Sequence, residues 1–236
     1  MFDYNFWGRY LSVFDRVLVL ARVHDVEFVA HGWKRSDGEG VSFEALPSYA
    51  GPWRYIQQLP RIRRITREAF SPGQAVILRI PSPIARNIEA RLRPYNYPYG
   101  VEVVGDPYDV FAPGAVRHPL RPFFRRFFLR MQRQQCRKAI AAAYVTTYTL
   151  QQRYPAGPNS LTTHYSSIEL PSSAFTSMER LFPFDKSSYT LITVGSLAQL
   201  YKAPDILIDA VALCIQAGLD IKLVIVGDGK HRPELE

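Results

Sequence analysis

The chain alternates short runs of apolar, β-branched residues with stretches of helical spacing, and this alternation constrains its fold more than any other feature. Buried strands are predicted where the apolar runs are strongest, at residues 16–23, 75–81 and 141–147. Strands that alternate with helices form βαβ units, in which the strands run parallel. The sequence therefore predicts an α/β fold, and ligands of such folds bind beyond the carboxyl ends of the strands.

Helical spacing fills most of the segments between these strands. We expect helices over residues 54–69 and 119–138 and a third helix after Ser82. Ser82 is a suitable N-cap for that helix, because Pro83 follows it at the first helical position.

The remaining pattern divides the chain into two unequal parts. Strands are expected at residues 41–47 and 100–107, and the Ser-, Thr- and Pro-rich residues 155–177 are typical of a connector. Residues 190–236 then supply only two strands and one helix, too few to cover both faces of a parallel sheet, so we expect an incomplete second domain. The predicted boundaries are 1–165 for a Rossmann-like N-terminal domain, 166–189 for the connector and 190–236 for the first β-α-β unit of a second Rossmann-like domain.

The composition limits the classes of protein that the chain can belong to. With 236 residues, of which 47% are hydrophobic and 21% charged, it is globular in composition. No apolar run approaches the roughly 20 residues of a membrane-spanning helix, and the first residues lack the features of a signal peptide. Cys136 and Cys214 lie far apart in the sequence and are expected to be reduced thiols. These features predict a cytoplasmic protein.

The segment VGSLAQLYKAPD has the features of a phosphate-binding loop between a strand and a helix. Gly195 ends the strand and lacks a side chain, so a ligand can approach the backbone there. Lys202 supplies a positive charge suited to phosphate, and the free amides of a helix that begins near Pro204 also favour anions. The alternative is a surface lysine on an ordinary loop.

A second glycine-containing loop follows the next strand. The segment IKLVIVGDG indicates a buried strand that ends in Gly227, Asp228 and Gly229. Glycine at these positions lets a ligand lie close against the strand ends. The alternative is an ordinary tight turn between a strand and a helix.

Together, VGSLAQLYKAPDILIDAVALC and LVIVGDGKHRPELE resemble the start of the donor domain of group 1 glycosyltransferases, a large family of retaining enzymes with the GT-B fold. The basic N-terminal part, which ends in YVTTYTLQQRYP, resembles the acceptor domain of bacterial members that build polysaccharides. The resemblance implies that Gly195, Ser196 and Lys202 contact the diphosphate of a nucleotide-sugar and that Gly227 and Gly229 lie near its nucleotide. It also implies sugar transfer to a glycan or lipid-linked acceptor, without a metal ion or other cofactor.

Two features depart from the pattern of that family. Ser196 stands where many members have arginine, so one positive charge fewer lies beside the leaving group. The glutamate-bearing motif that holds the donor sugar lies well after the second strand in the family, and the sequence ends before it. We therefore expect a fragment of such a transferase. The alternative is a non-catalytic, truncated remnant, a basic domain that binds a membrane or a partner chain.

Side chains near strand ends in the N-terminal domain are candidates for the acceptor cleft. Asp106 ends a predicted strand. It is a candidate for acceptor binding or for acid or base catalysis, and the alternative is a cap of a helix or turn. Arg79 is either a cation of the cleft or the partner of a carboxylate, and Ser82 lies just beyond it. No paired-aspartate motif for a metal ion is present, because Pro107 favours a loop between Asp106 and Asp109.

Residues 117–138 hold eight Lys or Arg and no acidic residue, and the net charge of the whole chain is +8. In a helical projection the phenylalanines gather on one face and the arginines lie on the flanks and back. Either the aromatic face packs on the sheet and the arginines face water, or the helix contacts anionic lipid at the inner face of a membrane. A nucleic-acid partner is not expected, because no recognised module is present, and a dehydrogenase would need a GxGxxG turn.

Overall fold

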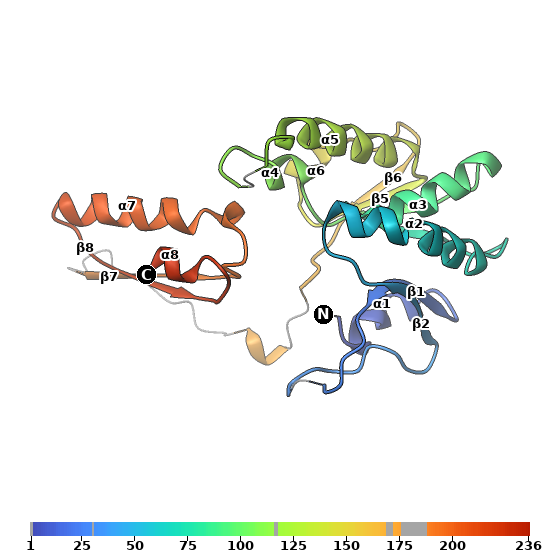
Figure 1. Cartoon of the computed structure of the whole chain (residues 1–236), viewed down its shortest axis with the longest axis horizontal. Helices are drawn as coiled ribbons and strands as arrows, with labels where there is room; N and C mark the ends of the chain where they lie inside the picture. Colours follow the sequence, from blue (N-terminus) through green and yellow to red (C-terminus); the bar gives the residue numbers. More distant parts are fainter. Residues whose placement is uncertain (1, 30, 116–117, 169–171, 176–187) are drawn as a thin grey trace.

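A computed structural model describes residues 2–29, 31–115, 118–168, 172–175 and 188–236 (Figure 1). Every pairing between its strands is parallel. The strands form a two-stranded sheet, a four-stranded sheet and a second two-stranded sheet. The predicted α/β class with parallel sheets is thus confirmed, and the arrangement is compatible with Rossmann-like folds. Most of the predicted connector 166–189 lies outside the described residues.

The first sheet follows an aromatic N-terminal segment. Phe6 and Trp7 pack with Val41 in a small buried cluster, which fixes this segment against the sheet. Both strands lie where the sequence predicts them, but the described residues between them form no helix, unlike the usual crossover of a βαβ unit. The elements are the 3-10 helix η1 (Tyr4–Trp7), α1 (Gly8–Leu11), β1 (Val17–Val23) and β2 (Val41–Pro47).

Helix α2 (Gly51–Glu68) packs on the first sheet. Its residues Ile62 and Ile65 form a buried cluster with Leu46 of β2. The helix begins three residues before the predicted start at residue 54, because proline is favourable in the first turn of a helix and Pro52 lies there.

The four-stranded sheet has the strand order β3-β4-β5-β6, and helices from its crossovers cover one face. The N-cap predicted at Ser82 is confirmed, because its hydroxyl accepts hydrogen bonds from the amides of Ile84 and Ala85. The elements are β3 (Ile77–Ile80), α3 (Pro83–Leu92), η2 (Arg93–Tyr95), β4 (Gly100–Val103), α4 (Pro107–Val110), α5 (Arg121–Lys138), β5 (Ala141–Tyr144), α6 (Thr149–Arg153) and β6 (Leu161–His164), followed by η3 (Ser172–Ala174).

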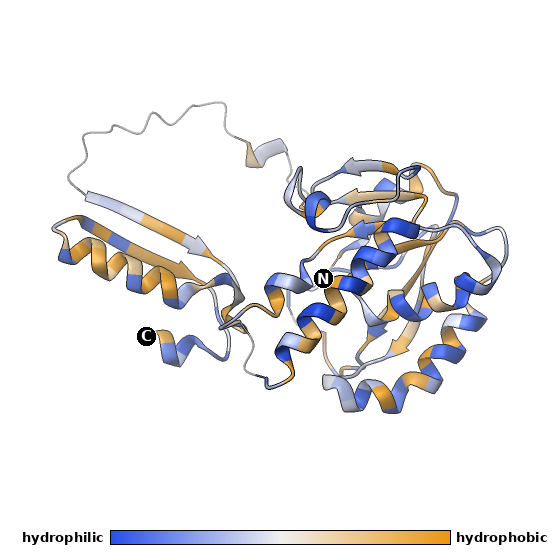
Figure 2. Cartoon of the chain, turned by 90° about the horizontal axis from the view of Figure 1, so that it is seen from above, coloured by the Kyte–Doolittle hydropathy of each residue, from blue (hydrophilic) through white to orange (hydrophobic). Residues whose placement is uncertain are grey.

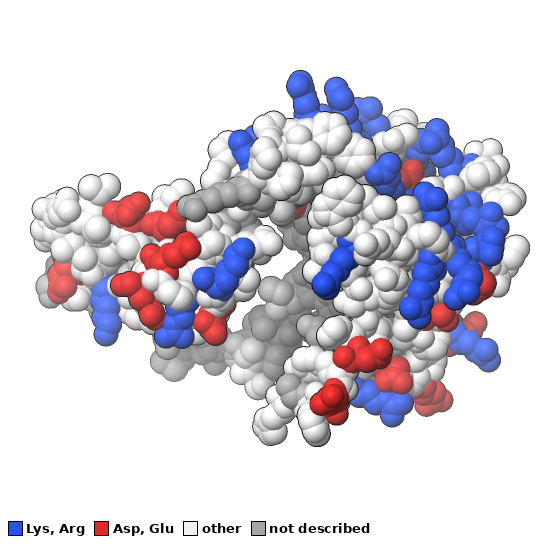
Figure 3. All heavy atoms as spheres, viewed as in Figure 1, with Lys and Arg blue, Asp and Glu red and all other residues white. Residues whose placement is uncertain are grey.

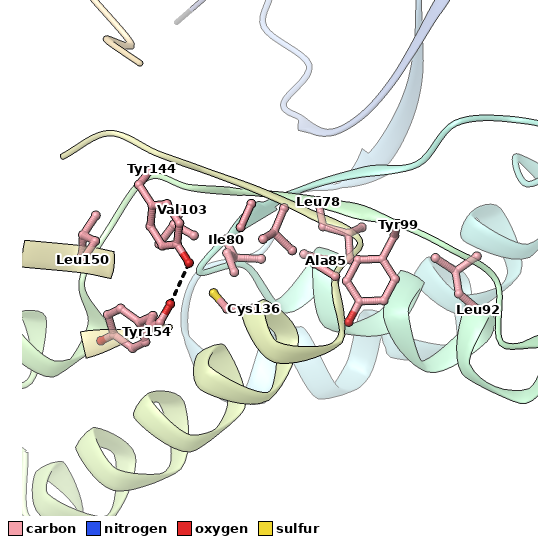
Figure 4. Close-up of a cluster of buried hydrophobic side chains, with 13 residues drawn as sticks. Leu78, Ile80, Ala85, Leu92, Tyr99, Val103, Cys136, Tyr144, Leu150 and Tyr154 are labelled. Atoms are coloured by element: carbon pink, nitrogen blue, oxygen red, sulfur yellow. Dashed lines mark hydrogen bonds between the residues drawn. The ribbon is translucent and has the colours of Figure 1, made fainter. Parts of the chain in front are cut away.

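The main hydrophobic core lies between this sheet and its helices (Figure 4). Ile80 and Val103 of neighbouring strands are fully buried, and Cys136 of α5 packs against them. The hydroxyl of Tyr144 donates a hydrogen bond of 2.8 Å to the backbone oxygen of Tyr154, which satisfies a polar group inside the core. This core positions the loops at the carboxyl ends of β3, β4 and β5.

Strand β6 corrects the interpretation of residues 155–177 as a connector. Its residues Leu161–His164 pair with β5, although the sequence there is rich in Ser and Thr. All four residues are exposed, so the apolar alternation that marks a buried strand is missing.

Helix α5 buries polar side chains as well as apolar ones against the sheet. The residues of α5 that are fully buried are Gln132, Gln135 and Cys136, in its second half. Phe124 and Phe128 contact Phe111, which follows α4. Among the described residues, each helix is too short or too polar to cross a bilayer.

The C-terminal residues form the second two-stranded sheet, in which β7 and β8 pair over seven residues each. Hydrophobic residues run along α7 and both strands (Figure 2). Ile192 and Val194 of β7 are 67% and 71% exposed, because the described residues offer only a few partners for this sheet. The elements are β7 (Ser188–Val194), η4 (Leu200–Lys202), α7 (Pro204–Gln216), β8 (Asp220–Val226) and α8 (Arg232–Leu235).

Candidate functional site

The loops that follow β7 and β8 lie directly beside each other. The amide of Gly195 donates a hydrogen bond of 2.9 Å to the oxygen of Val226, and the amide of Leu197 donates one of 2.9 Å to the oxygen of Asp228. The amide of His231 returns a bond of 3.2 Å to the oxygen of Leu197. The parallel pairing therefore continues past the strand ends, and the two predicted glycine loops form one surface.

Lys202 lies over Gly195 at this surface. A Cβ atom placed on Gly195 would lie 3.0 Å from the Nζ atom of Lys202 and 3.2 Å from its Cδ atom. The chain turns directly after Lys202, where Ala203 has a left-handed conformation with φ of 53°, and α7 begins at Pro204. The structure thus brings the ammonium group, the bare backbone of Gly195 and the first turn of α7 together, which is an arrangement suited to anions.

Gly227 and Gly229 make room for the neighbouring loop. A Cβ atom on Gly227 would overlap the backbone oxygen of Gly195, and one on Gly229 would overlap the backbone of Leu197 and Ala198. These contacts agree with the alternative interpretation of an ordinary tight turn, and the nearness of both glycines to a nucleotide stays a prediction. Gly227 thus allows the backbone of Gly195 to come close, and Gly229 does the same for Leu197 and Ala198.

Ser196 is exposed next to Gly195. Its hydroxyl accepts a hydrogen bond of 3.2 Å from the amide of Ala198, which fixes the turn of the loop. Among the described residues, Lys202 forms no ion pair with a carboxylate. The positive charge of this loop is therefore not neutralised within the described part of the chain.

Arg79 lies inside the N-terminal part of the molecule, paired with a carboxylate. Its guanidinium lies 2.5 Å from Glu102 Oε2 and donates a hydrogen bond of 3.3 Å to the hydroxyl of Tyr165. The hydroxyl of Tyr165 also interacts with Glu102. The rings of Phe2 and Phe6 cover the guanidinium at 4.8 and 5.4 Å. Burial opposes the charge of Arg79, but Glu102 and the two nearby tyrosine hydroxyls outweigh burial and raise its pKa.

Asp106 occupies the loop after β4 and makes the contacts of a helix cap. Its Oδ1 atom accepts hydrogen bonds from the amide of Tyr108 at 2.9 Å and from the hydroxyl of Tyr154 at 2.5 Å. Its Oδ2 atom forms an ion pair with Arg153, which also lies 3.0 Å from Asp109. These contacts agree with the alternative interpretation of Asp106 as a cap, and its role as an acid or base stays a prediction.

The loops after β3 and β4 touch each other. A Cβ atom on Gly105 would lie 3.1 Å from Pro81, the residue before Ser82. The hydroxyl of Ser82 caps α3, and Arg79 pairs with Glu102 on the sheet. Asp106 pairs with Arg153, so the three candidates have different partners. Their part in an acceptor cleft stays a prediction.

Glu102 and Arg153 are the polar residues of this region that the sequence interpretation misses. A signal for Glu102 exists, because the carboxylate lies between Val101 and Val103 in an apolar strand and a buried charge needs a partner. Arg153 gives no such signal, since it ends a short helix in a polar segment. Among the described residues, no three His, Cys, Asp or Glu side chains converge in a way that could hold a metal ion.

Comparison with known proteins gives one similar relative. The chain is 27% identical to Protein CapJ of Staphylococcus aureus over 236 residues, which is the whole of this chain and 58% of the relative. A scan against known protein families finds no match. The chain thus spans somewhat more than half the length of the curated relative that it resembles.

Proposed function

We propose that the chain is part of a glycosyltransferase of the GT-B type that acts in the synthesis of capsular polysaccharide. In this proposal a sugar moves from a nucleotide diphosphate to a glycan or lipid-linked acceptor in the cytoplasm. The similarity to Protein CapJ supports the role in capsule synthesis. The observation that carries the proposal is the position of Lys202 over Gly195, at the carboxyl end of β7 and beside the start of α7.

The surface of these loops suits the leaving group of such a reaction. When the bond between the sugar and the nucleotide diphosphate breaks, negative charge develops on the phosphate oxygens. The ammonium of Lys202 can stabilise this charge by a charge-assisted hydrogen bond, and the free amides of α7 add the favourable end of the helix dipole. Gly195 lets the diphosphate approach the backbone, and the neighbouring loop with Gly227 holds Gly195 in place.

Titration of the full chain with UDP, GDP and nucleotide-sugars in a calorimeter tests the donor site. We expect Lys202→Ala to weaken nucleotide binding by roughly tenfold or more, because a charge-assisted hydrogen bond is lost. Lys222→Ala is the matched control, since Lys222 is an exposed cation near the start of β8, at the opposite end of the strand.

Equal affinity of Lys202→Ala and the unmodified chain for nucleotides would overturn the donor site. The alternative function is a non-catalytic basic domain that binds a membrane or a partner chain. The positive charge of α5, which contains no acidic residue, favours this alternative as a second candidate. Failure of every nucleotide to bind, together with retained binding to anionic surfaces, would support this alternative.

A further inference from the structure

The outer face of α5 carries a stripe of exposed residues that the candidate donor site does not use. Phe123, Arg126, Arg130, Gln134 and Arg137 recur every three or four residues and therefore share one side of the helix. At a rise of about 1.5 Å per residue, the stripe is roughly 20 Å long. We refer to these five residues as the outer stripe.

A surface groove with a volume of about 340 Å³ lies along the second half of the helix. It is lined by Arg130, Arg133, Gln134, Arg137 and Lys138, four of which are cations. Arg133 is held in place, because its Nε atom donates a hydrogen bond of 2.7 Å to the backbone oxygen of Arg153. The four cations make the groove suited to anionic groups such as phosphate.

The described part of the chain does not neutralise these cations. Three cations of α5, namely Arg121, Arg125 and Arg133, donate to backbone oxygens. The other cations of α5 form no ion pair with a carboxylate of the described residues, and α5 itself has no acidic residue. Blue side chains gather over α5 and the adjoining helices (Figure 3). An anionic partner of considerable extent would match this surface.

Apolar side chains at the start of the same helix indicate which anionic partner fits. Leu120 and Phe123 are 55% and 60% exposed beside these arginines. Phe123 stacks on Phe127, at 5.9 Å between the ring centroids, and contacts Phe124 edge-on. A soluble polyanion gains little from exposed Leu and Phe side chains, whereas a bilayer offers both headgroup phosphates and an apolar boundary.

We propose that the outer stripe of α5, with Leu120 and the groove cations, docks on an anionic lipid bilayer. Headgroup phosphates occupy the groove between Arg130 and Lys138, and Leu120 and Phe123 enter the boundary between headgroups and acyl chains. The surface lies on α5 and does not depend on the nucleotide site, so it stands even if the proposed sugar transfer is wrong.

Vesicle sedimentation of the full chain tests this surface, with vesicles of phosphatidylcholine alone or mixed equally with phosphatidylglycerol. We expect binding to the mixed vesicles only, weakened by salt. The triple variant Arg130→Gln/Arg137→Gln/Lys138→Gln should bind roughly 100-fold more weakly, since each cation near an anionic membrane contributes about fivefold. The matched control Arg16→Gln/Lys222→Gln/Lys230→Gln removes the same charge from exposed cations outside α5 and should bind nearly as well as the unmodified chain.

Phe123→Ser distinguishes a bilayer from a soluble polyanion. We expect it to weaken vesicle binding by about fivefold, because less apolar surface is buried, and to leave binding to soluble polyphosphate unchanged. Circular dichroism shows whether each variant is folded. Equal loss in the groove variant and the control variant would overturn the proposal, because net charge alone would then act. Binding to polyphosphate or single-stranded RNA without binding to the mixed vesicles would also overturn it.

Discussion

The guanidinium of Arg79 and the carboxylate of Glu102 form an ion pair of 2.5 Å across β3 and β4, at positions that are directly paired in the sheet. Their side chains are 25% and 10% exposed, and the hydroxyl of Tyr10 donates a further bond of 2.5 Å to Glu102. This cluster attaches the N-terminal segment to the sheet, since Tyr10 belongs to α1.

Glu102→Gln should therefore destabilise the chain strongly. The substitution keeps the shape of the side chain but leaves the guanidinium of Arg79 without its counter-charge, so we expect the free energy of unfolding to fall by about 3 kcal/mol. Urea unfolding followed by circular dichroism measures this change. Glu68→Gln is the control, because the Arg64–Glu68 pair is 62% exposed on both sides, and we expect a loss below about 0.5 kcal/mol. A loss for Glu102→Gln as small as that of the control would show that the cluster adds no stability.

Gly227→Ala should disrupt the pairing of the loops after β7 and β8. The added Cβ would overlap the oxygen of Gly195, so the loops must separate, and we expect faster hydrogen exchange at the amides of Gly195 and Leu197. Nucleotide affinity should fall as well. Gly218→Ala is a useful comparison, because Gly218 has a positive φ of 86° but open space around it, so only backbone strain of about 1 to 2 kcal/mol results. Unchanged exchange in Gly227→Ala would contradict this packing.

Asp106 provides a test that separates capping from catalysis. Asp106→Ala removes the cap and the partners of Arg153 and Tyr154, so we expect the free energy of unfolding to fall by about 2 to 3 kcal/mol. Asp106→Asn keeps an acceptor for the amide of Tyr108 and should lose less. We expect nucleotide affinity to stay unchanged in both variants. An Asn variant with full stability but without sugar transfer, measured in an assembly that supports transfer, would instead assign Asp106 to the reaction.

Alkaline pH should destabilise the chain through its buried tyrosines. Burial, and then the nearby charge of Glu102, raises the pKa of Tyr165 from 10.0 to about 12, and burial followed by the hydrogen bond to Glu102 also raises the pKa of Tyr10. Below pH 10 both states keep their protons, and this stabilisation is complete. Above pH 10 the unfolded chain loses protons first, so stability falls as the pH rises towards 12. Urea midpoints and tyrosinate absorbance over this range should change together, and a midpoint that does not fall would contradict the burial of these hydroxyls.

The sequence predicts the parallel α/β pattern well, because strands such as Ile77–Ile80 and Val17–Val23 are rich in apolar and β-branched residues. Strand β6 escapes prediction because exposed Thr and His residues show no apolar period. The nearness of Gly195, Lys202 and Gly227 follows from the rule that parallel strands end at the same edge. The contacts of Gly227 do not follow from that rule, because a glycine that faces a ligand and one that faces a neighbouring loop look identical in sequence.

Helix α5 shows another limit of sequence patterns. A helical projection gathers the phenylalanines on one face, yet the most buried side chains of α5 include Gln132 and Gln135. Gln132 donates a hydrogen bond of 3.0 Å to the oxygen of Gly105, a contact made possible by a loop 27 positions earlier in the chain. No local period of the sequence records a long-range partner of this kind.

The parallel pairing of every strand has a consequence for how the chain acquires its structure. Within the described residues, no two neighbouring strands form a hairpin, so Val17 can pair only once Val41 is available, and Ser188 only once Asp220 is available. Assembly is therefore governed by distant segments that must meet, which is slow compared with local folding. During synthesis on the ribosome, each first strand stays an open apolar edge until its partner emerges, and that interval is when the nascent polypeptide is most exposed to aggregation.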